Sequence, residues 1–275
     1  KPPAYKTDKT IRFNSRFESG NLLYAYKLNQ DAYHCIIDPD NSSSDQCQWF
    51  YFQMSNIQII PNSIRKITLY ISGFNKESSI ISNGWKVFMY SEKMSRIKNV
   101  SWFRAGQNYS YGLTKHDSTT SYENKSYRRK KQKNNIGNTK NYTLQFQVTL
   151  PYDDDIVYLS YGVPYTFTDL NTYITRWTSS SSSLISCTTL CQTNNRKNCP
   201  LLTITAPNSP SSIKKKCIFL TARSHPGETN GSLILHGLIE FLLSKQPSSE
   251  FLLHNFIFKI VPMINIDGVI DGSYH

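Results

Sequence analysis

The chain has 275 residues, a formal net charge of +12 and 39% hydrophobic residues. This apolar content is enough to bury a core, which excludes wholesale disorder, and the length predicts one large domain or two ordinary ones. The sequence has no apolar run of roughly 18 residues and no apolar leader, and its six cysteines are irregularly spaced. We therefore expect an intracellular protein with reduced cysteines and no membrane insertion.

The first part of the chain, up to about residue 155, consists of short aromatic and β-branched runs separated by turn residues. The clearest runs are Gln48–Met54, Ile64–Ile71 and Tyr142–Leu150. Their alternation and spacing predict an antiparallel β-sandwich, which we assign to a domain of residues 1–155.

A polar and basic segment at residues 116–141 interrupts this pattern. Between Lys115 and Lys140 lie eight Lys or Arg residues and two acidic residues. The segment therefore carries a net charge of 8 − 2 = +6, half of the +12 of the whole chain. We expect a flexible insertion between two strands, either simply solvated or in contact with an acidic partner. Because the charge is concentrated in one loop, we expect no specific nucleic-acid partner.

The second part of the chain, residues 156–275, has a different pattern. Ile218–Ala222 is an unbroken apolar run, as in a strand that is buried on both faces. Gly231–Lys245 has apolar residues at helical spacing, and Phe256–Ile264 is a second apolar run. Strand, helix and strand predict a βαβ unit and an α/β/α domain with a mainly parallel sheet.

The sequence His-Pro-Gly-Glu at 225–228 lies between the first of these strands and the helix. Ligand sites of such sheets lie at the carboxyl ends of the strands. A turn can aim His225 and Glu228 at one point, where an imidazole nitrogen and a carboxylate oxygen would bind zinc. Such a pair is more often satisfied by backbone hydrogen bonds than by a metal ion, and a catalytic zinc needs a third protein ligand.

Two segments around this motif, Leu220–Asn230 and Phe258–Ile270, resemble the peptidase domain of the M14 zinc metallocarboxypeptidases. Four earlier segments resemble the amino-terminal β-domain of the cytosolic carboxypeptidase branch and its junction with the peptidase domain. They are Phe13–Leu22, Gln48–Phe52, Trp102–Gly106 and Tyr161–Leu170. The resemblance spans nearly the whole chain and implies a β-sandwich followed by an incomplete carboxypeptidase domain.

This resemblance implies removal of carboxy-terminal residues, chiefly glutamates of polyglutamylated or acidic tails such as those of tubulin. It implies a cytoplasmic protein, associated with microtubules or cilia, that binds Zn²⁺ through His225 and Glu228. The third ligand, the general base and the carboxylate clamp are expected beyond residue 275, so we expect no catalytic residue within this chain and no activity of the chain alone. His275 stands where the family has an arginine thought to stabilise the oxyanion, and an imidazole lacks its fixed charge.

Two other functions are compatible with the motif. One is a non-catalytic pseudo-peptidase that binds acidic tails, and the other is an acylase like the aspartoacylases, which share the His-x-x-Glu arrangement. The segments that resemble the β-domain argue against the acylase. We expect His236, on the predicted helix, to be a core residue and Asp267, in an Asn-x-Asp-Gly turn, to be structural.

Overall fold

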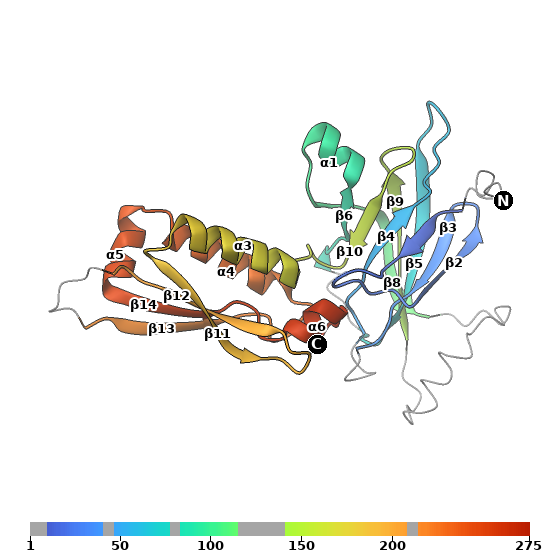
Figure 1. The fold of residues 1–275 in the computed structure, drawn as a ribbon. Helices are drawn as coiled ribbons and strands as arrows, with labels where there is room; N and C mark the ends of the chain where they lie inside the picture. The colour runs from blue at the N-terminus through green and yellow to red at the C-terminus, as the bar shows by residue number, and fades with distance from the viewer. Residues whose placement is uncertain (1–9, 41–46, 78–82, 115–140, 208–213) are drawn as a thin grey trace, which may run out of the picture. The chain divides into compact units, whose positions relative to one another are not determined.

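The computed structural model describes residues 10–40, 47–77, 83–114, 141–207 and 214–275 (Figure 1). The chain divides into two compact units, residues 1–161 and 162–275. The sequence pattern had placed this boundary at about residue 155. The basic insertion expected at residues 116–141 lies, apart from Asn141, outside the described residues, and its conformation stays a prediction.

The first unit contains two five-stranded sheets. One has the order β1-β4-β10-β6-β7, and all its pairs are antiparallel. Its strands are β1 (Arg12–Asn14), β4 (Tyr51–Ser55), β6 (Phe88–Ser91), β7 (Phe103–Arg104) and β10 (Val157–Ser160). A short helix, α1 (Glu92–Lys98), follows β6.

The other sheet has the order β2-β3-β5-β9-β8 and is antiparallel except for the pair β3 and β5. Its strands are β2 (Tyr24–Asn29), β3 (Ala32–Ile36), β5 (Arg65–Phe74), β8 (Gln107–Leu113) and β9 (Tyr142–Leu150). Alternate residues of β9 are buried, as expected for a strand with one face on a core. Phe13 of β1 packs on Tyr33 of β3 with ring centroids 5.3 Å apart, so side chains of the two sheets meet. The predicted β-sandwich is confirmed.

The second unit is a four-stranded sheet with helices packed against it (Figure 1). The sheet order is β11-β12-β14-β13. Its strands are β11 (Ile185–Gln192), β12 (Asn198–Ile204), β13 (Lys216–Thr221) and β14 (Phe256–Val261). The helices are α3 (Phe167–Ser180), α4 (Thr229–Leu242), α5 (Pro247–Asn255) and α6 (Ile266–Asp271).

The predicted βαβ unit is present as β13, α4 and β14, and these two strands are parallel. The sheet as a whole, however, is mixed rather than mainly parallel. β11 and β12 form a hairpin, and β12 also pairs antiparallel with β14. A hairpin reverses the chain within a few residues, so its strands must be antiparallel.

The expectation that Ile218–Ala222 is buried on both faces is wrong. Within the described residues, β13 pairs with β14 alone and lies at an edge of the sheet. Its side chains alternate between half-buried and exposed, and Phe219 is 60% exposed. The apolar run reflects a strand of β-forming residues, but one of its faces has no covering layer in the described structure.

Helices α3 and α4 lie side by side over one face of this sheet (Figure 1). Helix α3 begins with a capping box, in which Thr166 and Asp169 exchange side-chain and backbone hydrogen bonds. Its Leu170, Ile174 and Trp177 enter the core. Helix α4 buries Leu235 and Ile239 in the same core. This packing places the start of α4, and the turn before it, beside the end of β13.

Candidate metal centre

The His225–Glu228 turn connects the carboxyl end of β13 to the first residue of α4. Glu228 is the N-cap residue of that helix, and its N–H is bonded to the carbonyl of His225 at 3.2 Å. The two side chains converge, since His225 Nδ1 lies 3.2 Å from Glu228 Oε1. They are 41% and 56% exposed, so the space that they face is open to a ligand.

This donor set fits zinc, because an imidazole nitrogen and a carboxylate oxygen are both zinc ligands. Among residues 10–275, leaving aside the parts that the structure does not describe, no group of three or more His, Cys, Asp or Glu side chains could hold a metal ion. The two side chains would therefore supply part of a coordination sphere that needs one more protein ligand.

The buried residue Arg223, which is only 5% exposed, holds the turn in place through hydrogen bonds. Its Nε and Nη2 donate to the carbonyl of Pro226 at 3.0 and 2.6 Å. Its Nη1 donates to the Tyr165 carbonyl and to Ser232 Oγ, both at 3.0 Å. Burial lowers the pKa of Arg223 to about 10, and the nearby Tyr165 raises it, so the guanidinium is charged at neutral pH. One buried cation thus holds the turn, α4 and the segment before α3 in register.

Backbone conformation at this point is also unusual. Arg223 has a φ of 58°, a left-handed conformation that non-glycine residues seldom adopt. Its carbonyl accepts from Asn265 N–H at 3.0 Å. The hydrogen bonds of the guanidinium and of the backbone together offset the strain of that conformation.

The far side of the turn packs closely against the last residues of the chain. Gly227 N–H donates to the Tyr274 carbonyl at 2.9 Å. A Cβ on Gly227 would lie 2.6 Å from Tyr274 Cδ2, and a Cβ on Gly268 would lie 2.5 Å from Pro226 Cγ. Both positions therefore require glycine, because neighbouring atoms approach the backbone too closely to leave room for a Cβ. Any side chain at position 227 would displace the turn.

His275 is brought to the same place. Its ring stacks on that of His225 with centroids 3.8 Å apart and planes at 31°. From the sequence, His275 is the residue that stands where the family has an arginine, and it is one of three histidines, with His236 and His254, that could complete a metal site. Its contact with His225 could not be found from spacing, because 50 residues separate the two in the chain.

His236 on α4 packs against aromatic side chains, as expected for a core residue. Its ring makes edge contacts with Tyr165, Tyr173 and Trp177, and its Nδ1 lies 3.2 Å from Tyr165 Oη. Burial, the largest effect, lowers its pKa, although Glu240 raises it.

Asp267 is structural, also as expected. Its carboxylate accepts from Thr193 Oγ1 at 2.8 Å and from Asn195 N–H at 3.1 Å, and so ties α6 to the β11–β12 hairpin. All six cysteines are free thiols in the structure.

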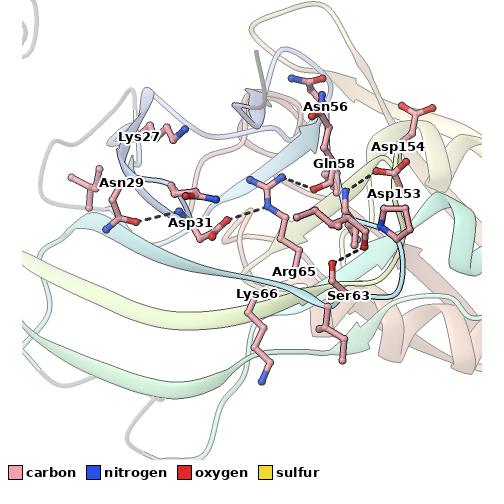
Figure 2. Close-up of a pocket in the computed structure, with 17 residues that line it drawn as sticks. Lys27, Asn29, Asp31, Asn56, Gln58, Ser63, Arg65, Lys66, Asp153 and Asp154 are labelled. Carbon is pink, nitrogen blue, oxygen red and sulfur yellow. Dashed lines mark hydrogen bonds and ion pairs between the residues drawn. The ribbon is translucent and has the colours of Figure 1, made fainter. Parts of the chain in front are cut away.

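A separate hollow of about 1560 Å³ lies in the first unit (Figure 2). Three of its charged side chains, those of Asp31, Arg65 and Asp153, are engaged with one another or with backbone. Arg65 Nε lies 3.1 Å from Asp31 Oδ1, its Nη1 donates to the Gln58 carbonyl, and Asp153 Oδ1 accepts from Ile59 N–H (Figure 2). No functional residue was predicted at this hollow, and its side chains do not converge on a common point.

The mixed sheet with a His-x-x-Glu turn at the end of a strand defines the class of the second unit. Residues 170–273 match the family model described as zinc carboxypeptidase. Residues 13–161 match the model described as cytosolic carboxypeptidase N-terminal domain, and the chain therefore belongs to the cytosolic carboxypeptidase family.

Curated relatives agree with this assignment. The chain is 36% identical over 271 residues to cytosolic carboxypeptidase 2 of Xenopus tropicalis, a match that covers 96% of this chain and 25% of the relative. It is 34% identical over 278 residues to cytosolic carboxypeptidase 3 of Mus musculus, covering 100% of this chain and 25% of the relative. The chain thus spans about a quarter of the length of these relatives.

Solved structures show the same fold. A metallo-carboxypeptidase from Burkholderia cenocepacia matches with a TM-score of 0.69 and 20% identity, over 97% of this chain and 59% of that one. A carboxypeptidase from Shewanella denitrificans matches with a TM-score of 0.66 and 23% identity, over 96% and 57%. Within the described residues, no helix is both long and apolar enough to span a membrane.

Proposed function

We propose that this chain is part of a zinc-dependent carboxypeptidase that removes glutamates from the carboxy-terminal acidic tails of proteins such as tubulin. The observation that carries the proposal is the convergence of His225 and Glu228, 3.2 Å apart at the end of β13, in a chain of the cytosolic carboxypeptidase family. The substrate class follows from the family resemblance and from the positive charge of the chain, which complements acidic tails. We place the protein in the cytoplasm, at microtubules or cilia.

His225 and Glu228 would hold the zinc ion, and a third protein ligand would come from beyond residue 275. The chemistry that a zinc ion would supply there is polarisation of the scissile carbonyl of the substrate and acidification of a water molecule. Arg223 keeps the two ligands aimed at one point through its bonds to the Pro226 carbonyl. His275, stacked on His225, restricts the orientation of that imidazole. We assign no general base to the described residues.

The rival proposal is a pseudo-peptidase that binds acidic tails without cleaving them. It is favoured by His275, which stands where the family has arginine, because an imidazole provides no fixed positive charge for an oxyanion. The match of residues 13–161 to the cytosolic carboxypeptidase N-terminal domain speaks against an aspartoacylase-like function.

The test uses the 275-residue chain and the protein encoded by the complete transcript. Each is incubated with zinc and a peptide that ends in several glutamates, and free glutamate is measured. We expect release by the complete protein, its loss in His225→Ala, and no release at an enzymatic rate by the 275-residue chain. Tail binding without release by the complete protein would support the pseudo-peptidase. Release that survives His225→Ala would contradict the metal assignment.

A further inference from the structure

A second candidate site lies in the first unit, on the outward face of the sheet that contains β4, β10 and β6. In its register, Tyr158 stands opposite Gln53 on one side and Tyr90 on the other. The neighbours of Tyr158 along β10, Val157 and Leu159, are buried in the sandwich. Because side chains alternate along a strand, Tyr158 and its cross-strand neighbours face away from the core.

Four aromatic rings on this face form a closed cycle, which we call the aromatic basin. Tyr51 and Trp102 have centroids 5.8 Å apart, Trp102 and Tyr90 5.6 Å, Tyr90 and Tyr158 6.1 Å, and Tyr158 and Tyr51 6.1 Å. Each ring thus contacts two others. All four are only partly buried. A ring face attracts a cation that lies within roughly 6 Å of the ring centroid.

The basin is hollow and its rim is acidic. A cavity of about 700 Å³ is lined by the four rings and by Phe17, together with Glu18, Glu92 and Arg96. The charged side chains that line the cavity are thus two carboxylates and one guanidinium, in a chain whose overall charge is strongly positive. Arg96 Nη2 lies 4.0 Å from Glu92 Oε2, and because the Arg96 side chain is 71% exposed, this ion pair is screened by solvent and weak.

Glu92 is placed by the fold. It is the first residue of α1, whose N-cap Ser91 accepts from Met94 N–H at 2.9 Å and donates to the buried Asp155 at 2.5 Å. The Glu92 carboxylate accepts from Tyr158 Oη at 3.4 Å. The acid is thus anchored at the edge of the ring cycle, where a cation above the rings would meet it.

The chemistry of the basin selects its ligand. Ring faces carry negative potential and attract cations, and carboxylates strengthen this attraction and repel phosphates and acidic peptides. We propose that the aromatic basin binds a cationic side chain, lysine or arginine, from a basic segment of a partner polypeptide. This site is independent of the proposed zinc site and of its acidic substrate, since it takes the opposite charge.

The experiment titrates the 275-residue chain with a short lysine-containing peptide, its arginine counterpart and its lysine-acetylated form, by calorimetry and tryptophan fluorescence. We expect saturable binding of the two cationic peptides and none of the acetylated one. Glu92→Gln, which keeps the shape of the side chain, and Trp102→Ala should each weaken binding by about tenfold or more. Glu77→Gln is the matched control, since Glu77 is exposed, lies outside the basin and changes the net charge equally.

Circular dichroism of each variant separates loss of the site from loss of the fold, and Glu92→Gln carries the test if Trp102→Ala unfolds. Binding that is equal in Glu92→Gln and Glu77→Gln would overturn the proposal. So would equal binding of the acetylated peptide, or Trp102-dependent binding of a single-stranded oligonucleotide, which would make the basin a stacking platform for bases.

Discussion

Arg223 donates two hydrogen bonds to the carbonyl of Pro226, at 3.0 and 2.6 Å, from beneath the turn that carries His225 and Glu228. We predict that Arg223→Ala lowers the free energy of unfolding by about 3 kcal/mol, because it leaves two carbonyls without their charged donor. Chemical denaturation measures this. Arg196→Ala is the matched control, since Arg196 has the same φ of 58° but is exposed. Equal losses in the two variants would show that backbone conformation, not the hydrogen bonds, sets the cost.

The turn was found from the sequence because its residues are close together in the chain and because the segments around it resemble the M14 metallocarboxypeptidases. His225, Glu228 and the glycine between them are consecutive or nearly so, and they follow an apolar run that predicts a strand. Arg223 was not singled out, because arginine is usually exposed and nothing in the pattern reveals a buried one. Its bond to the Tyr165 carbonyl joins residues far apart in the chain, which only the folded structure brings together.

Helix α3 was also not predicted from the sequence. The residues Leu170, Ile174 and Trp177 have helical spacing, but no helix was predicted there, because Thr and Ser residues surround them. The signal that could have found it is the capping box of Thr166 and Asp169. Strand β11 was missed because seven of its eight residues are exposed, so it lacks the alternation of a half-buried strand.

The capping box gives a prediction for the stability of α3. Thr166 Oγ1 accepts from Asp169 N–H at 3.0 Å, so Thr166→Ala should cost about 1 kcal/mol of unfolding free energy. Thr172→Ala, in the exposed middle of the same helix, should be neutral or slightly stabilising because alanine has the higher helix propensity. Thermal unfolding of both variants checks this. A loss in Thr172→Ala as large as in Thr166→Ala would refute the role of the cap.

His236 makes stability depend on pH. Burial lowers its folded pKa below the ordinary value of 6.5, so the unfolded chain binds the proton more readily. The contribution of neutral His236 is present above pH 6.5 and is lost as pH falls from there towards the folded pKa. Glu240, whose pKa is lowered chiefly by its bond from Trp177, acts in the same direction at lower pH.

We predict that the His236 ring titrates with a midpoint below 6.5 by NMR, and that His236→Gln reduces the loss of stability between pH 7 and 5. His254→Gln, at an exposed position, is the matched control for the exchange of histidine for glutamine. A His236 midpoint above 6.5 would mean that Glu240 outweighs burial.

The basic segment at residues 116–141 predicts salt-dependent binding. Affinity of the chain for a polyglutamate peptide should fall steeply between low and physiological ionic strength, because exposed charges are screened. Deletion of the segment should weaken that binding and leave a cooperative unfolding transition. If the transition disappears on deletion, the segment is part of the folded core and not an insertion.

The most direct test of the zinc assignment is a titration of the 275-residue chain with Zn²⁺, followed through the imidazole resonances of its six histidines. We predict that the His225 resonances respond first, and that His225→Ala and Glu228→Gln each weaken zinc binding more than about tenfold, while His254→Ala does not. Zinc binding that leaves His225 unmoved, as an ion held by the exposed cysteines would, contradicts the account.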